Sequence, residues 1–483
     1  MPTTENAPNI LFILTDQWRG DCLGYTGHPA VETPHLDHLA GEGITFTQAY
    51  ASCPVCVAAR ATILTGLAPK RHGYLTNGGV QWDYPVTLPG TLSDAGYHTQ
   101  CVGKMHVYPW RNLVGFHNVV LHDGYMHRAR RENREFGLND DYTPYLREKL
   151  GAVYADHNDS GVGCNGYAAQ AWPYHEMLHP TSWVTSQGID FLRRRDTSKP
   201  FFLTLSYHRP HPPLDPPASF LNRYLQKDIP PPAMGNWVDH ELRKGGHDSP
   251  IPRDPALVDY ARRAYYAQIS HIDFQINRMI MALNEYGVQD NTAILFTADH
   301  GEMLYDHNHV GKGVPYDGSA RVPFILRMPK TSGPSADIAR GSLVESPVEL
   351  RDIFPTFCDI AGIDTPDDLD GESVLNCGGN NWRPFIHGEH ATSANQWLTD
   401  GKEKYAWFTQ TGRELLFDLT EDPREINDLS RDRPDRLAWW RDQLIEELTG
   451  RPEGFVQNGK LVPGQPIQGL LPHVGKGVPK GAI

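Results

Sequence analysis

Short apolar segments, rich in β-branched and aromatic residues, recur along this chain, and segments of helical periodicity separate some of them. Five of these segments have the length and composition of buried β-strands. They are Ile10–Thr15, Thr99–Val102, Phe201–Ser206, Ala293–Thr297 and Phe324–Arg327. The alternation of strands and helices predicts an α/β fold in which helices flank a mixed, largely parallel sheet.

The clearest helical segment precedes the fourth of these strands. Its apolar side chains recur at steps of three or four residues, and Gly287 lies just beyond the last of them. The residues with this spacing are Tyr265, Ile269, Ile272, Ile276, Ile280 and Leu283. The pattern predicts an amphipathic helix that ends before Gly287.

The composition changes near residue 385. Two short strand candidates, Tyr405–Thr409 and Glu414–Asp418, lie in a polar stretch that leads to one amphipathic helix, Pro434–Leu448, and a Gly- and Pro-rich end. We therefore expect a larger α/β domain over residues 1–385. Residues 386–483 should form a smaller α+β subdomain with a small antiparallel sheet, one helix and an extended tail.

The net charge and the hydropathy exclude several classes of partner. A formal net charge of −14 argues against binding to nucleic acid or to an anionic membrane through bulk charge. The early apolar run at residues 9–14 is too short to cross a bilayer, and no basic segment or cleavage site accompanies it. As written, the chain has no export signal and we expect it in the cytoplasm; a precursor with a leader would instead be periplasmic or secreted. The sequence leaves open whether the protein forms a homo-oligomer.

Seven cysteines are an odd and small number for 483 residues, which argues against a disulfide scaffold. Cys53 and Cys56 form a C-x-x-C pair. A redox role for such a pair needs a thioredoxin-like context, and a zinc site needs a second pair; the sequence offers neither.

The segment around Cys56, residues 53–66, reads CPVCVAARATILTG. A short helix from Ala58 to Leu64, closed by Gly66, would place Cys56 at a helix N-terminus, where free N–H groups and the helix dipole favour an anion. Arg60, one helical turn further on, would point to the same side. The alternative is a buried structural cysteine on a core helix.

Two polar dipeptides directly follow apolar strands. Asp16-Gln17 follows ILFILT, and Asp299-His300 follows AILFTA. In open α/β sheets, ligands bind beyond the carboxyl ends of the strands. Both dipeptides therefore lie where a binding or active site is expected, although they are far apart in the sequence.

The pattern Cys56-x-x-x-Arg60, followed by Leu64-Thr65-Gly66, resembles the signature of type I, formylglycine-dependent sulfatases of the alkaline phosphatase superfamily. Ala58 stands where that family usually has proline, and its radical-type anaerobic maturases accept alanine there. Other segments resemble the family's in the same order along nearly the whole chain. They are Asn9–Pro29, Gly103–His106, Arg209–Pro213, Ala298–Glu302, Gly311-Lys312, Ser319–Pro323, Leu416–Leu419 and Asp422–Leu429.

The resemblance implies an alkaline-phosphatase-like fold and the hydrolysis of sulfate monoesters of sugars or aryl alcohols. Cys56, oxidised to formylglycine by a maturase, would be the nucleophile. One of its oxygens would complete a metal site with Asp16, Gln17, Asp299 and His300. Carboxylate and amide oxygens suit Ca²⁺, while the imidazole of His300 keeps Mn²⁺ and Mg²⁺ open.

The resemblance also assigns roles to cationic side chains. Lys104 and Lys312 would clamp the sulfate oxygens, and Arg60 would hold the nucleophile. His106 and His211 would be the general base and the general acid, because imidazole titrates near neutral pH.

Two alternatives stay open. A phosphonate monoester or phosphodiester hydrolase of the same superfamily also uses formylglycine, with similar Asp-Gln and Asp-His pairs. Lys104 together with His106 favours the sulfatase, because those enzymes generally replace this pair. The other alternative is a catalytically inactive binding homologue in which Cys56 stays a thiol.

Overall fold

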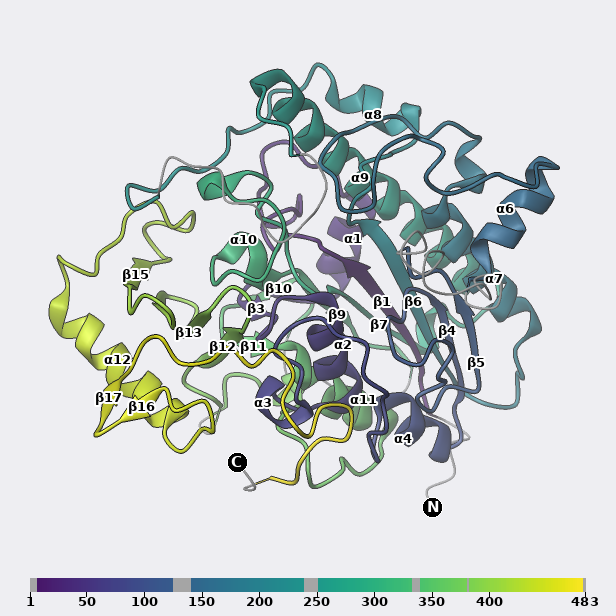
Figure 1. Cartoon of the computed structure of the whole chain (residues 1–483). Helices are drawn as coiled ribbons and strands as arrows, with labels where there is room; N and C mark the ends of the chain where they lie inside the picture. Colours follow the sequence, from purple (N-terminus) through teal and green to yellow (C-terminus); the bar gives the residue numbers. More distant parts are fainter. Residues whose placement is uncertain (1–6, 125–139, 239–250, 332–338, 380–381, 481–483) are drawn as a thin grey trace.

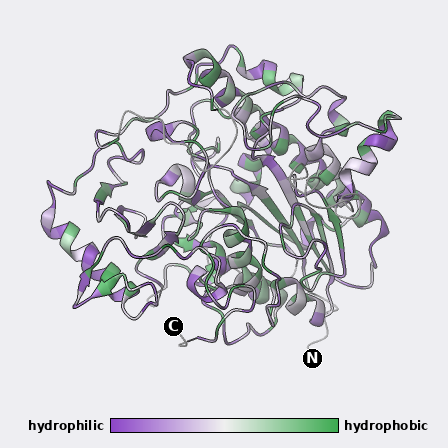
Figure 2. Cartoon of the chain, in the orientation of Figure 1, coloured by the Kyte–Doolittle hydropathy of each residue, from purple (hydrophilic) through white to green (hydrophobic). Residues whose placement is uncertain are grey.

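The computed structural model describes residues 7–124, 140–238, 251–331, 339–379 and 382–480. An eight-stranded sheet lies at the centre, helices cover it, and a four-stranded sheet lies beside it (Figure 1). Apolar residues concentrate in the central sheet and in the helices around it (Figure 2). No helix in the described ranges is both long and apolar enough to span a bilayer.

The central sheet has the strand order β10-β2-β9-β7-β1-β6-β4-β5. Its strands are β1 (Asn9–Asp16), β2 (Ile44–Phe46), β4 (His98–Gly103), β5 (Asn118–Leu121), β6 (Phe201–Pro210), β7 (Thr292–Ala298), β9 (Phe324–Arg327) and β10 (Ser342–Val344). All neighbours pair in parallel except β9, which is antiparallel to β2 and β7. The five predicted strands and the mixed, largely parallel sheet are confirmed.

The helices pack on both faces of this sheet. On β6, Phe202 packs against Phe357 of α11, whereas Leu205 lies against Gly188 of α7. Positions 202 and 205 differ by an odd number, so their side chains leave opposite faces of the strand. The principal helices are α1 (Pro34–Glu42), α2 (Cys56–Thr65), α4 (Leu88–Asp94), α7 (Pro180–Arg194), α9 (Pro255–Glu285) and α11 (Ile353–Ala361). As predicted, α9 ends before Gly287.

The C-terminal part contains a separate antiparallel sheet. Its strands, in order, are β12 (Ile386–His390), β13 (Asn395–Thr399), β14 (Glu403–Phe408) and β15 (Glu414–Asp418). Helix α12 (Pro434–Leu448) packs on this sheet through Trp440 and Leu444, which are fully buried. The predicted α+β subdomain is thus confirmed, whereas the division after residue 385 stays a prediction.

Shorter elements and the C-terminal tail complete the chain. The tail returns to the larger domain, where the Leu471 amide donates to Gly73 O at 2.9 Å. The remaining elements are β3 (Ala49–Tyr50), β8 (Arg321–Val322), β11 (Val348–Glu349), β16 (Val456–Gln457), β17 (Lys460–Leu461), α3 (Pro69–His72), α6 (Tyr142–Leu150), α8 (Ala218–Tyr224) and α10 (Asp317–Ala320).

Candidate active site

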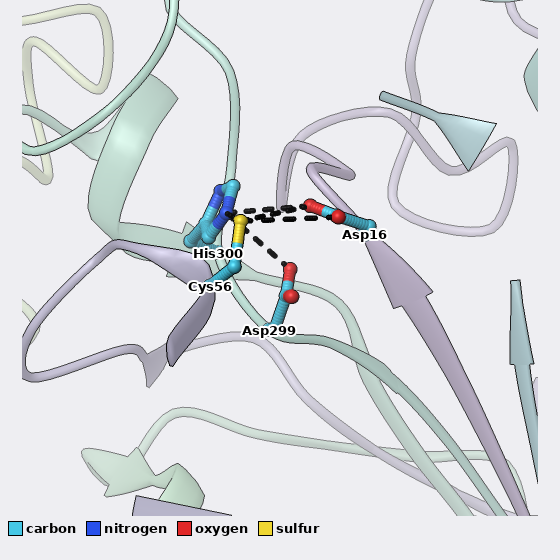
Figure 3. Close-up of side chains that lie close together, drawn as sticks. All are labelled: Asp16, Cys56, Asp299 and His300. Carbon is cyan, nitrogen blue, oxygen red and sulfur yellow. Dashed lines mark hydrogen bonds and ion pairs between the residues drawn. The ribbon is translucent and has the colours of Figure 1, made fainter. Parts of the chain in front are cut away.

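Four buried side chains converge at the carboxyl ends of β1 and β7 (Figure 3). Asp16 is the last residue of β1, Asp299 and His300 directly follow β7, and Cys56 is the first residue of α2. One ligand atom from each of the four lies within 4.8 Å of the others. The two polar dipeptides that the sequence separates therefore meet at one edge of the sheet, as their place after the strands predicts.

Helix α2 positions Cys56. Val55 is extended, the helix begins at Cys56, and Gly66 ends it in the left-handed conformation with φ 67°. All ten residues of the helix are buried. The amide of Val57 is capped by Asn77, whose Oδ1 accepts at 3.0 Å. The short helix predicted here is confirmed, and it begins slightly earlier than expected.

The surroundings of Cys56 stabilise an anion. Its Sγ lies 3.2 Å from His300 Nε2 and 3.2 Å from Lys312 Nζ. Burial and a neighbouring carboxylate would raise the pKa of the thiol, but the positive charges of Lys104, Lys312 and His300 hold that pKa well below its usual value. For Cys53, three residues before Cys56, burial instead raises the pKa. A negatively charged group is therefore favoured at position 56.

The two carboxylates of the site differ in their electrostatics. Burial would raise the pKa of Asp16, but Lys104, whose Nζ forms a buried ion pair with it, holds that pKa well below its usual value. Burial and the charge of Asp16 raise the pKa of Asp299, although Arg60 Nε donates to Asp299 Oδ2 at 2.9 Å. Two like-charged carboxylates buried this close together favour an added cation.

Arg60 joins three parts of the site. Besides its ion pair with Asp299, its Nη1 donates to Lys104 O at 2.6 Å and to Ser206 Oγ at 3.0 Å. Its Nη2 has no hydrogen-bond partner among the described residues. The sequence places Arg60 beside the nucleophile; the structure adds that it holds Asp299 and the main chain at Lys104.

The ring of His300 is oriented by its own main chain. Its Nδ1 lies 2.9 Å from Gly301 O, an atom that can only accept, so the proton is assigned to Nδ1. Nε2 then faces Cys56 and lies 3.4 Å from Asp16 Oδ1 and 3.5 Å from Asp299 Oδ1. Burial would lower the pKa of this ring, but the charge of Asp299 raises it, so a proton on Nε2 is also favoured while Cys56 is an anion. A cation bound at Nε2 would displace that proton, and Gly301 O would hold the ring as in a metal-ligating histidine.

Gln17 is fixed at every polar atom. It adopts a positive φ of 71°, and its amide donates to Asp299 Oδ1 at 3.2 Å. Its Nε2 donates to the carboxylate of Glu302, so Oε1 is turned toward Lys312, whose Nζ donates to it at 2.6 Å. Tyr167 also donates to Glu302 at 2.7 Å. The sequence assigns no role to Glu302 or Tyr167; the one signal it offers is that Glu302 follows the Asp299-His300 pair.

The loop that carries Lys104 and His106 is held by Asp123, to which the sequence assigns no role. Asp123 Oδ1 accepts from Met105 N at 2.7 Å and from His106 N at 3.1 Å. His106 has a φ of 58°, in the left-handed region that non-glycine residues rarely adopt. Lys104 N donates to Ser206 O at 2.8 Å, which attaches the same loop to β6.

His211 lies next to the metal-ligand candidates. Its amide donates to Asp16 O at 3.1 Å, and its Nδ1 lies 2.8 Å from Pro212 O. Burial and then the charge of Lys312 hold the pKa of His211 well below its usual value. Its ring contacts that of His208, with the ring centroids 4.8 Å apart. The lowered pKa favours the neutral form of the His211 ring at neutral pH.

The sequence model of the Sulfatase family matches residues 8–363, and that of the N-sulphoglucosamine sulphohydrolase C-terminal region matches residues 305–450. An arylsulfatase of Clostridium perfringens (strain 13 / Type A) is 46% identical over 483 residues, which cover 97% of this chain and 99% of that protein. The multifunctional alkaline phosphatase superfamily protein PehA of Trinickia caryophylli is 27% identical, with 92% of this chain and 95% of that protein covered.

A solved structure extends this likeness to the fold. The phosphonate monoester hydrolase of Agrobacterium radiobacter superposes with a TM-score of 0.76 at 26% identity, and the match covers 91% of this chain and 95% of that chain. The alkaline-phosphatase-like fold predicted from the sequence is thereby confirmed. Because the family model and the arylsulfatase both match most of its length, the chain belongs to the sulfatase family and is a sulfuric ester hydrolase.

Proposed function

We propose that this enzyme hydrolyses sulfate monoesters with formylglycine, formed from Cys56, as its nucleophile. The observation that carries the proposal is the place of Cys56, at the N-terminus of α2 and in contact with both His300 and Lys312. Formylglycine supplies an aldehyde hydrate with two hydroxyl groups: one attacks sulfur, and the other later expels sulfate and restores the aldehyde. A thiol has no second hydroxyl for that release.

The conversion of Cys56 needs a maturase, and we propose that it acts before this segment folds. Cys56 is fully buried, and so is every other residue of α2. An enzyme therefore cannot reach the thiol in the folded protein without unfolding the helix. Ala58 belongs to the same helix and is also fully buried.

The donor set fits a divalent cation. Asp16 and Asp299 offer carboxylate oxygens, and His300 offers Nε2, because its Nδ1 is held by a main-chain oxygen. Gln17 offers its amide oxygen, because its Nε2 is bonded to Glu302. Oxygen ligands favour Ca²⁺, and the imidazole is compatible with Mn²⁺ or Mg²⁺. Bound there, the cation would act as a Lewis acid and offset negative charge.

The lysines would bind the transferred sulfate group. Lys312 Nζ lies 3.2 Å from Cys56 Sγ, and Lys104 Nζ forms an ion pair with Asp16. Lys104 is fully buried and Lys312 is partly buried, so water screens their attraction for sulfate oxygens less than it would at the surface. Arg60 would keep Asp299 and the Lys104 main chain in place.

The two histidines would move protons. His211, neutral in the empty site, would gain proton affinity when an anionic sulfate ester enters, and would then protonate the leaving alcohol. His106 would accept the proton of the second hydroxyl as sulfate leaves. The main-chain bonds to Asp123 hold His106 in the conformation from which it would act.

The substrates we propose are sulfate monoesters of an aryl alcohol or a sugar, with no nucleic acid or membrane partner. The arylsulfatase relative supports the aryl group, and the N-sulphoglucosamine sulphohydrolase match supports a sugar. Assays with a panel of aryl sulfates and sulfated sugars would identify the leaving group.

A phosphonate monoester hydrolase is the second candidate, because the Agrobacterium radiobacter structure superposes well on this fold. Lys104 and His106 favour sulfate. We expect an aryl sulfate to be turned over with a higher kcat/KM than the matching aryl phosphonate. The same leaving group in both substrates controls for its reactivity. A much faster phosphonate reaction would reverse the assignment.

Removing the cation should abolish turnover and lower the melting temperature. The physical reason is that Asp16 and Asp299 then repel each other inside the protein. A cation at about 100 times its Kd stabilises the folded state by about 2.7 kcal/mol. Chelation followed by readdition of Ca²⁺, Mn²⁺ or Mg²⁺ would measure both effects, with Ca²⁺ expected to restore most. Full turnover in protein shown by elemental analysis to be metal-free would contradict the proposed metal site.

A further inference from the structure

The loop that carries Lys312 is held from two sides through its neighbour Gly313. The amide of Gly313 donates to Pro54 O at 3.1 Å, and its carbonyl accepts from Asn395 Nδ2 at 2.9 Å. Pro54 lies on the segment that leads into Cys56, whereas Asn395 is the first residue of β13 in the C-terminal sheet. One residue thus connects the nucleophile segment with the C-terminal subdomain.

The contact at Gly313 is too close for any side chain. A Cβ at this position would lie 2.7 Å from both Cε1 and Nδ1 of His390, the last residue of β12. The φ of Gly313 is +84°, a conformation that favours glycine. The ring of His390 therefore packs directly on the Gly313 main chain, on the same hairpin that supplies Asn395.

The hairpin of β12 and β13 is itself attached to the nucleophile segment. The amide of Glu389 donates to Ser52 O at 2.7 Å. Asn395 is 1% exposed, and its Oδ1 has no hydrogen-bond partner among the described residues. Its Nδ2, which also lies 3.5 Å from Ser393 O, makes its shorter bond to Gly313 O. The NH₂ group of this buried amide therefore bonds mainly to the loop that carries Lys312.

We propose that Asn395 is a positioning residue for Lys312. By fixing the Gly313 carbonyl, it keeps Lys312 Nζ 3.2 Å from Cys56 Sγ and 2.6 Å from Gln17 Oε1. The C-terminal subdomain then forms part of the frame of the active site. This inference rests on the proposed function, in which Lys312 binds the sulfate group. A displacement of about 1 Å in such a group is enough to slow a reaction by about 10²-fold.

Two substitutions of Asn395 test this role. Asn395→Ala leaves the Gly313 carbonyl buried without its donor, and Asn395→Asp keeps the shape but places an acceptor against that carbonyl. We expect kcat for an aryl sulfate to fall by about 10- to 100-fold, more in the aspartate variant. The affinity for inorganic sulfate, measured by calorimetry, should fall with it. A purely structural residue would lower the melting temperature without changing either quantity in folded protein.

The matched control is Thr399→Val at the other end of the same strand. Thr399 is also fully buried, and its hydroxyl donates to Glu403 O at 2.7 Å, within the C-terminal sheet. The Thr399→Val variant should be less stable than the wild type but keep the wild-type kcat and sulfate affinity. If both Asn395 variants fail to fold, His390→Ala takes their place and should lower both quantities. Folded variants with wild-type kcat and sulfate affinity would overturn the inference.

The failure of the proposed function would look different. Wild-type protein that binds inorganic sulfate but turns over no sulfate ester would contradict the proposed reaction. The sulfate affinities of the Asn395 variants would still decide whether this residue positions Lys312. Lys312→Ala, which should lose sulfate binding, shows that the measured sulfate occupies this site.

Discussion

Replacing Cys56 with alanine should lower the kcat for sulfate esters by more than about 10³-fold, because the variant has no nucleophile. The protein should still fold. Alanine is smaller than cysteine, and it is favourable at a position inside a helix. Circular dichroism and thermal unfolding would confirm the fold, and turnover of an aryl sulfate would measure the loss. Substantial turnover by this variant would remove Cys56 from the mechanism.

The same prediction has a chemical signature in the unaltered protein. Active enzyme should contain a peptide in which the Cys56 sulfur is replaced by oxygen with two hydrogens fewer, and its aldehyde should react with a hydrazide probe. Peptide mass spectrometry of protein from the native host measures this directly. Fully active protein with an intact thiol at position 56 would exclude the formylglycine route. An inactive protein with that thiol would instead favour the binding homologue.

Cys53 provides the matched control. It lies three residues before Cys56 and is also fully buried, but the charges that lower the pKa of Cys56 do not act on it; burial raises its pKa. Cys53→Ala should therefore lose stability through a small cavity, at most a few kcal/mol, and keep its kcat. An equal loss of kcat in both variants would point to a joint role of the C-x-x-C pair.

The parts of the fold that the sequence predicts correctly are those with a local pattern. Buried parallel strands are continuous apolar runs, and a long helix repeats its apolar positions, so both are visible without tertiary contacts. The boundaries are less visible: β6 continues past Ser206 to Pro210. The added residues include His208 and Arg209, which are buried in the structure but polar in the sequence.

The supporting residues of the site could not be predicted in this way. Glu302 orients Gln17, Asp123 holds the His106 loop, and Asn395 fixes the main chain beside Lys312. Each of these contacts joins positions that are separate in the chain, and the polar residue involved belongs to no local repeat. Their roles depend on which segments the fold brings together, so they appear only in three dimensions.

Replacing Arg60 with alanine should damage stability and turnover together. The ion pair of Arg60 Nε and Asp299 Oδ2 at 2.9 Å is buried, with the side chains 3% and 0% exposed. Removing one partner of such a pair leaves an uncompensated charge and costs about 3–5 kcal/mol of unfolding free energy. The variant also loses the bonds that hold Lys104 O and Ser206 Oγ. Because the groups that would stabilise charge in the transition state are then displaced, kcat should fall by about 10²–10³-fold.

The variant Arg327→Ala separates the loss of stability from the loss of turnover. Arg327, on β9, pairs with Ile294 near the start of β7, whereas Asp299 follows the end of that strand. Arg327 is 1% exposed; its Nε donates to Glu42 at 3.1 Å, and its Nη1 donates to Thr292 O at 3.3 Å. Urea unfolding should show a loss of stability in both variants, smaller for Arg327→Ala because the side chain of Glu42 is 29% exposed. Only Arg60→Ala should lose kcat at temperatures where both proteins are folded. Equal kcat values in the two variants would show that Arg60 stabilises the fold and does not support the reaction.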